Sequence, residues 1–127
     1  FLAQRQRLAD RYFDVFPSID GAVLPPQGVP GQSWNMFCVL LPYEALGTTR
    51  QAFRAALREQ GIATGLSYEP SHLTTLGRSL GWRDGQFPNA ERIGRETVTL
   101  PLHCGMTDAD VDRVCVAVAQ VLGAPAR

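Results

Sequence analysis

The stretch Gly61-Ile62-Ala63-Thr64-Gly65-Leu66-Ser67-Tyr68-Glu69-Pro70-Ser71-His72 decides how the rest of the chain is arranged. A helix is predicted to end at Gly61 and a short strand to follow over Ile62 to Leu66, after which polar side chains come in close succession. Polar groups just past a buried strand are often functional, because the scaffold there is rigid and the loop is exposed. The sequence therefore predicts either a site in the loop 67–72 or a plain connector.

Three elements are predicted upstream of this stretch. Residues 34–41 are almost wholly apolar and are followed by Pro42, which favours a central strand that is covered on more than one side. Thr48-Thr49-Arg50-Gln51 resembles a capping box with its hydroxyl at the first position, and it predicts a helix that runs to Gly61. A brief strand is expected over 22–24, before a loop rich in glycine and proline over 27–32.

The two ends of the chain carry the clearest helical patterns. The first helix is predicted over 1–16, with apolar residues at helical spacing, and Pro17 and Ser18 end it. The last helix is predicted to start after Thr107, with acids in its first turn. Its apolar positions are typical of a core-facing stripe and comprise Val111, Val114, Cys115, Val118, Val121 and Leu122.

Between the loop and the last helix, the pattern predicts two shorter helices and a strand. The first helix spans 72–80 with Ser71 as its cap, which places the loop near a positive helix end that favours anions. A second helix starts at Pro88 and reaches Glu96, and a strand follows over 97–100. The fold class is therefore α+β, a small, mostly antiparallel sheet with helices packed on one face. The direction of the strand 62–66 stays open, because a parallel crossover from 34–41 is also possible.

Composition excludes several classes of function. Twelve cationic side chains balance twelve acidic ones without a basic stripe, so the sequence predicts no nucleic-acid partner. The longest apolar run, Met36 to Leu41, is too short to cross a membrane, and with no signal peptide in view we expect a cytoplasmic protein. Three cysteines without CxxC spacing predict no metal site. Every cation is arginine, so this chain supplies no amine for a Schiff base.

Four stretches of the chain have a characteristic order and spacing: Ser33 to Phe37, Gly61 to His72, Phe87 to Glu91 and Leu100 to Thr107. Together they resemble the C-terminal domain of the DegT/DnrJ/EryC1/StrS sugar aminotransferases, and the resemblance covers nearly the whole chain. The resemblance implies the small domain of a fold-type-I enzyme that depends on pyridoxal 5'-phosphate. It also implies amino transfer from glutamate or glutamine to a keto group of a nucleotide-linked sugar or a cyclitol, by a homodimer.

The resemblance further implies how this chain relates to the whole enzyme. Residues 1–127 correspond to the C-terminal small domain, and residues 1–16 to the truncated end of an inter-domain helix. The Schiff-base lysine and the cofactor belong to an N-terminal domain that is absent from this sequence. The chain is therefore expected to carry no catalytic residue and to be inactive alone.

Site residues are also implied by the resemblance. The family's His-Tyr-x-Pro-x-His pattern becomes Ser67-Tyr68-Glu69-Pro70-Ser71-His72 here. Tyr68 and His72 match the pattern and are expected to line the substrate side of the cleft. Ser67 replaces a histidine and cannot carry an imidazolium charge toward a diphosphate. Asn35 is expected to approach the ligand from the start of the strand 34–41.

Two further hypotheses come from other classes of protein. The chain, which has no lysine, is alternatively a free-standing, non-catalytic sugar-binding or regulatory module derived from that domain. A small hydrolase using Cys104 with His72 or His103 is the other reading, although no nucleophile-elbow pattern supports it.

Overall fold

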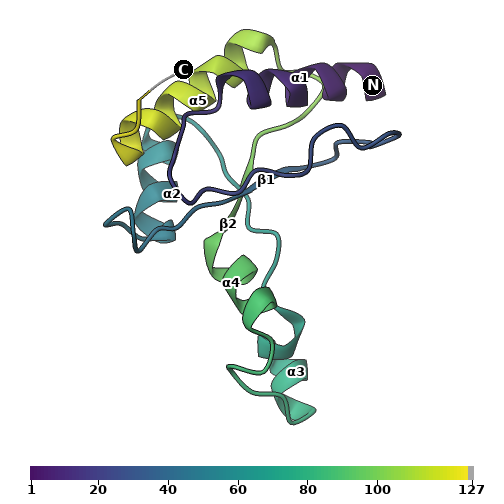
Figure 1. Ribbon diagram of the computed structural model, residues 1–127, viewed down its shortest axis with the longest axis vertical. Helices are drawn as coiled ribbons and strands as arrows, with labels where there is room; N and C mark the ends of the chain where they lie inside the picture. Colours follow the sequence, from purple (N-terminus) through teal and green to yellow (C-terminus); the bar gives the residue numbers. More distant parts are fainter. Residues whose placement is uncertain (126–127) are drawn as a thin grey trace.

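The structure, a computed structural model, describes residues 1–125 and has the α+β architecture that the sequence predicts. Helix α1 spans Leu2–Val15, and helix α5 spans Asp108–Leu122. These two helices lie side by side, with α2 (Arg50–Glu59) against α5, as Figure 1 shows. Strands β1 (Phe37–Leu40) and β2 (Thr97–Leu100) run beneath them, and the remaining helices extend away from the sheet.

The sheet has two antiparallel strands, and its register separates a buried face from an outer face. Phe37 pairs with Leu100 and Val39 with Val98, and all four of these side chains are buried. The outer face of the sheet, which carries the alternate positions, is formed by Cys38 paired with Thr99 and Leu40 paired with Thr97. Because side chains alternate along a strand, this register aims the polar pair Cys38 and Thr99 away from the core.

An aromatic cluster joins α1 to the buried face of the sheet. The Tyr12 ring stacks on Phe37 with 4.5 Å between ring centroids, and Phe13 meets the same ring edge-on at 5.2 Å. Trp34 also packs against Phe37. The hydroxyl of Tyr12 donates to the carbonyl oxygen of Pro101 at 2.7 Å, which ties α1 to the end of β2.

Ion pairs on the surface align α1 with α5. Arg11 donates to both carboxylate oxygens of Asp112, at 2.7 and 2.8 Å, and Arg7 pairs with Asp108. The hydrogen bond from Arg11 holds the pKa of Asp112 below its usual range. Pairs as exposed as these contribute little to the stability of the fold.

Helix ends follow the sequence signals at α5 but are displaced by one residue at α2. Thr107 and Asp110 form the expected capping box, and Gly123 takes the left-handed conformation that ends α5. The capping box predicted from Thr48 to Gln51 is wrong, because Thr49 is the N-cap and accepts from the backbone N–H of Ala52. No glutamine side chain can then close the box, since alanine occupies the third helical position.

The predicted strands are shorter in the structure. The strand 34–41 is reduced to β1, because Trp34 adopts a left-handed backbone (φ 43°) that cannot continue a strand. The predicted strand 62–66 contributes one antiparallel bridge, Gly65 to Thr99, and the strand 22–24 contributes one, Val23 to Leu40. Both bridges are antiparallel, so the parallel crossover left open by the sequence does not form.

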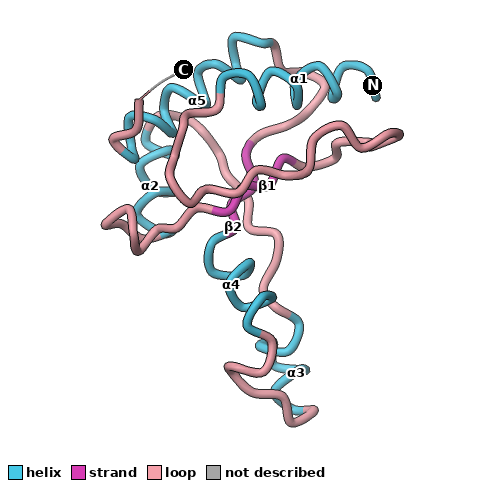
Figure 2. The backbone as a smooth tube through the Cα atoms, in the orientation of Figure 1, coloured by secondary structure: helices cyan, strands magenta, loops and turns pink. Residues whose placement is uncertain are grey.

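The helix predicted over 72–80 is two short pieces rather than one. A 3-10 turn, Ser71–Leu73, precedes α3 (Thr75–Ser79), and Thr74 rather than Ser71 caps α3 by accepting from the backbone N–H of Gly77. Helix α4 spans Pro88–Glu96, as predicted, and leads directly into β2. Residues 69–96, called the arm here, project from the sheet in Figure 2.

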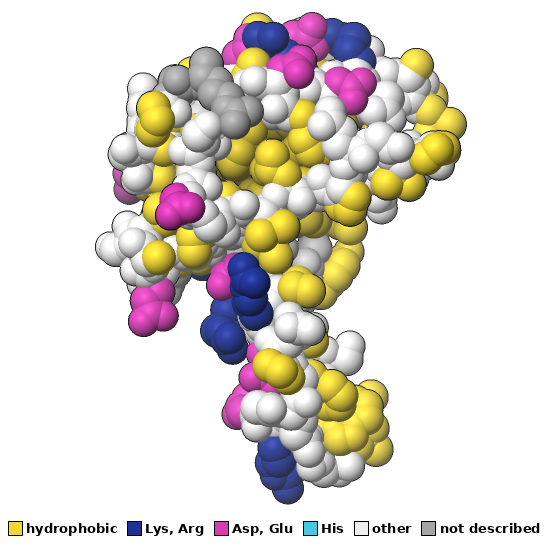
Figure 3. All heavy atoms as spheres, viewed as in Figure 1, with side chains coloured by type: hydrophobic (Ala, Val, Ile, Leu, Met, Phe, Trp, Pro, Cys, Tyr) yellow, Lys and Arg dark blue, Asp and Glu magenta, His cyan; other side chains and the backbone are white. Residues whose placement is uncertain are grey.

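The arm has little core of its own. Figure 3 shows hydrophobic side chains gathered on one side of it. Exposed apolar residues in the arm are Leu76, Leu80, Trp82, Phe87 and Ile93. Monomeric proteins seldom leave such contiguous patches open to water, so this side has the character of a contact surface.

Two kinds of feature are absent from residues 1–125. None of the helices there is long and apolar enough to cross a membrane. Within the same residues, the acidic, histidine and cysteine side chains form no group suited to hold a metal ion.

Candidate functional site

The outer face of the sheet continues into the loop that the sequence singled out. Ser67 Oγ lies 2.8 Å from Thr99 Oγ1, and Cys38 Sγ lies 3.4 Å from the same hydroxyl. Thr97 Oγ1 donates to the carbonyl oxygen of Ser67 at 3.4 Å. A row of small polar groups therefore crosses the two strands and reaches the start of the loop, and hydroxyls of this kind both donate and accept.

Gly65 allows this close approach. Its backbone exchanges both hydrogen bonds with Thr99, at 2.9 and 3.0 Å. A Cβ atom at Gly65 would lie 3.2 Å from the Cβ of Thr99, which is closer than most real contacts of this type. Glycine here therefore brings the loop against the outer face and sets the position of Ser67.

Tyr68 is strongly exposed. Its side chain is 72 % exposed, and its hydroxyl lies 3.9 Å from Met36 Sδ, next to the exposed Asn35. The structure thus brings Ser67 and Tyr68 to the start of β1, where Asn35 precedes the strand. The roles expected for Ser67, Tyr68 and Asn35 stay predictions.

A shallow pocket of about 410 Å³ lies beside Tyr68, where the arm leaves the sheet. Cationic Arg50 and Arg95 line it together with the acids Glu69 and Glu91. Arg50 donates to the carbonyl oxygen of Gly94 and so closes the base of the arm. Mixed charges and the hydroxyl groups of Tyr68 and Thr97 suit a polar ligand better than an apolar one.

His72 is separated from these groups. It is 4 % exposed, and its Nε2 lies 3.0 Å from Glu91 Oε1, while its ring packs on Phe87 at 4.8 Å. His72 is therefore not a solvated surface residue. Its Nε2 is directed at Glu91 inside the arm. The expected place of His72 beside the substrate stays a prediction.

Glu91 was not singled out from the sequence, although the structure gives it several contacts. Its Oε1 atom also accepts from the backbone N–H of Gly85 at 2.8 Å and of Phe87 at 3.3 Å. The hydrogen bond with His72, followed by those from the backbone, holds the pKa of this carboxyl below its usual range. The sequence signal that could have identified Glu91 is an acidic residue at an inward-facing position of α4. Its carboxylate holds the fold of the arm and is largely shielded from solvent.

Thr99 was missed as well. It is half-buried, on the face of β2 opposite the buried Val98 and Leu100, and the alternation of the strand assigns it to that face. Its partner Ser67 could not be found in this way, because the two residues are far apart in the sequence.

The cysteines show no arrangement for nucleophilic catalysis. Burial raises the pKa of the Cys115 thiol to about 12. Cys104 Sγ lies 4.0 Å from the carbonyl oxygen of Phe1, and His72 is paired with Glu91. The hydrolase hypothesis therefore gains no geometric support from these contacts.

Comparison with known proteins places the chain among aminotransferases. The family model of the DegT/DnrJ/EryC1/StrS aminotransferase family matches residues 1–119. The spore coat polysaccharide biosynthesis protein SpsC of Bacillus subtilis is 30 % identical over 122 residues, covering 94 % of this chain and 31 % of the relative.

Solved structures that are similar to this chain are also aminotransferases. The aminotransferase TlmJ from Streptoalloteichus hindustanus is 30 % identical with a TM-score of 0.79, covering 97 % of this chain and 32 % of that one. DesV from S. venezuelae, solved in complex with a ketimine intermediate, is 25 % identical with a TM-score of 0.80, covering 96 % and 32 %. The chain thus spans about a third of the length of the relatives it matches.

Proposed function

The chain belongs to the DegT/DnrJ/EryC1/StrS aminotransferase family, and on that basis we propose that it is the C-terminal small domain of a pyridoxal-phosphate-dependent sugar aminotransferase. The reaction is amino transfer from glutamate or glutamine to a keto group of a nucleotide-linked sugar or a cyclitol. The match over residues 1–119 carries this proposal. In this assignment, residues 1–16 are the end of an inter-domain helix and residues 17–127 complete the domain.

The cofactor does not fit this chain's own residues. Attachment of pyridoxal phosphate as a Schiff base needs a side-chain amine, and the sequence contains twelve arginines and no lysine. We therefore assign the cofactor and its lysine to a larger N-terminal domain, in keeping with relatives about three times as long. The part of this chain is to bind and orient the substrate.

The outer face and the loop supply groups for that task. The exposed Tyr68 hydroxyl, Ser67 and Asn35 are proposed to hydrogen-bond hydroxyl groups of the acceptor, with Thr99 behind Ser67. His72 is proposed to act indirectly, because its contact with Glu91 holds in place the segment that carries Tyr68. Positioning of this kind contributes to rate by restricting the substrate to a reactive geometry.

The exposed apolar side of the arm supports the proposed partners. Leucine and aromatic side chains there need a covering surface. We propose that the N-terminal domain or the second subunit of a homodimer provides it.

The absence of lysine equally suits the second candidate, a free-standing sugar-binding or regulatory module derived from the same domain. This module would bind a sugar with neither cofactor nor partner domain. The same loop and outer face would form its binding surface.

The test compares the full-length polypeptide that carries this chain with the 127-residue chain alone. Each is incubated with pyridoxal phosphate, glutamate and a panel of keto-sugar nucleotides and keto-cyclitols, and aminated product is measured by mass spectrometry. We expect product from the full-length protein only, and a Tyr68→Phe variant with kcat/KM reduced about tenfold. Turnover by the chain alone would contradict the proposal, and sugar binding by the chain without product from either protein would support the module instead.

A further inference from the structure

Helix α2 carries a row of arginines along one face. Arg50, Arg54 and Arg58 are spaced four residues apart, so their side chains lie one above another on the helix surface. Within residues 1–125, none of the three forms an ion pair with a carboxylate. Like charges at this spacing destabilise a helix, so the row is unfavourable unless something else neutralises it.

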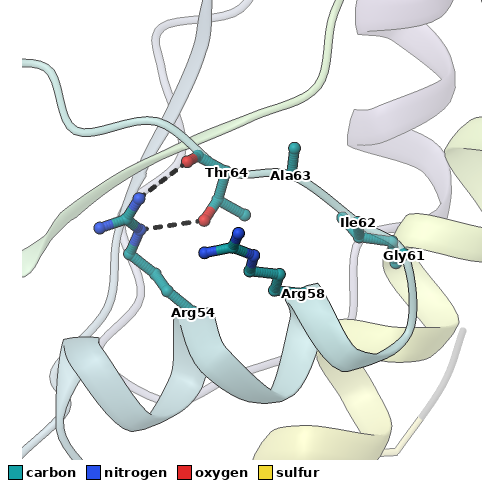
Figure 4. Close-up of a pocket in the computed structure, with 6 residues that line it drawn as sticks. All are labelled: Arg54, Arg58, Gly61, Ile62, Ala63 and Thr64. Carbon is teal, nitrogen blue, oxygen red and sulfur yellow. Dashed lines mark hydrogen bonds between the residues drawn. The ribbon is translucent and has the colours of Figure 1, made fainter.

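The last two arginines of this row face a pocket that lies apart from Tyr68. The pocket has a volume of about 410 Å³ and lies between α2 and the segment 61–64. Its lining comprises Arg54, Arg58, Gly61, Ile62, Ala63 and Thr64, and no acid is among them. Figure 4 shows both guanidinium groups turned toward the segment that contains Thr64.

The two guanidinium groups are held differently. Arg54 donates through Nε to Thr64 Oγ1 at 3.1 Å and through Nη2 to the Thr64 carbonyl oxygen at 3.0 Å. These bonds fix the plane of its guanidinium group and leave Nη1 outside them. Arg58 is exposed, and its guanidinium lies over the pocket beside Arg54. One anchored fork and one adjustable fork, a helical turn apart, present a concentration of N–H donors to an anion.

We propose that the pocket between α2 and residues 61–64 binds a diphosphate group through Arg54 and Arg58. Two linked phosphoryl groups suit the two arginines, whose Cβ atoms lie about 5–6 Å apart on successive turns of the helix. Arginine forks bind phosphoryl oxygens in a bidentate manner, and the lining contains no carboxylate to compete. This proposal is about anion binding alone, and it does not depend on the amino-transfer proposal.

The experiment is a titration of the isotopically labelled 127-residue chain with inorganic pyrophosphate, followed by amide NMR shifts at low salt. We expect shifts centred on residues 61–65, weaker binding of inorganic phosphate, and loss of affinity as salt screens the charges. Arg54→Gln and Arg58→Gln should each weaken binding about tenfold, and Arg58→Lys should weaken it less, since a cation remains. Arg83→Gln, in the arm, is the matched control and should bind as the unaltered chain does.

Three outcomes would overturn the assignment. These are pyrophosphate shifts that lie elsewhere, an Arg58→Gln variant with unchanged affinity, or tighter binding of the dicarboxylate glutarate than of pyrophosphate. Because none of these readouts requires turnover, a failed aminotransferase assay leaves the anion site standing, and the reverse also holds.

Discussion

Replacing Tyr12 by phenylalanine removes one hydrogen bond from the core and leaves the aromatic packing in place. The phenol ring is fully buried and stacks on Phe37, and phenylalanine keeps that ring. The lost bond is the one from the Tyr12 hydroxyl to the Pro101 carbonyl oxygen, at 2.7 Å. Burial raises the pKa of this phenol, so it is a protonated donor at any ordinary pH.

The expected cost is about 1–2 kcal/mol, because the change forfeits a net hydrogen bond and leaves a carbonyl group without its partner. The unfolding entropy is about 2.1 cal/mol/K per residue, or roughly 0.27 kcal/mol/K for 127 residues. The melting temperature should therefore fall by roughly 4–7 °C in circular dichroism or calorimetry.

Tyr43→Phe is the matched control. Tyr43 is also buried, but within residues 1–125 its hydroxyl has no hydrogen-bond partner. Removing an unpaired buried hydroxyl should leave stability unchanged or raise it slightly. A melting temperature that is unchanged in Tyr12→Phe, or that falls more in Tyr43→Phe, would refute the assigned hydrogen bond as a source of stability.

Three further predictions concern the arm and a thiol. Gly77→Ala should unfold the arm while the rest of the chain stays folded, because the new Cβ would lie 2.3 Å from the Ser71 carbonyl oxygen. Limited proteolysis and amide exchange measure this unfolding, and a variant whose arm resists the protease would contradict the prediction. The pKa of Glu91 is lowered by His72, so its contribution to stability is complete above the ordinary pKa of 4.5 and is lost as the pH falls through the lower folded value. Acid titration of arm amide signals should show this loosening, which Glu91→Gln should abolish. Cys115, with its raised pKa near 12, should resist a thiol reagent at pH 8 until the chain is unfolded, and labelling of the folded protein at this position would count against its burial.

Local signals predicted the ends of several elements well. Pro88 starts α4, Thr97–Leu100 forms β2, and Thr107 caps α5 as expected. In each case a short-range feature decides the outcome, such as the fixed backbone of proline or a hydroxyl within reach of a free N–H group. Such features act within one turn and can be recognised without knowing what lies nearby.

Strand length and helix continuity were harder to predict. The apolar run 34–41 fits a long strand, yet the backbone at Trp34 is left-handed and leaves the strand direction. The indole N–H of Trp34 donates to Gln6 Oε1 at 3.0 Å. The segment 62–66 reads as a strand but pairs at Gly65 alone. A strand requires a partner of matching length, and the partner β2 has only four residues.

The sequence by itself determined the family, the α+β class, the first and last helices and the polar segment that begins at Ser67. It did so because hydrophobic period, caps and motif spacing are local properties of the chain. Tertiary structure alone decided that Ser67 meets Thr99 on the outer face, that Tyr68 stays exposed, and that His72 turns inward to Glu91. These contacts join residues far apart in the chain, and they depend on which segments pack together once the core excludes water.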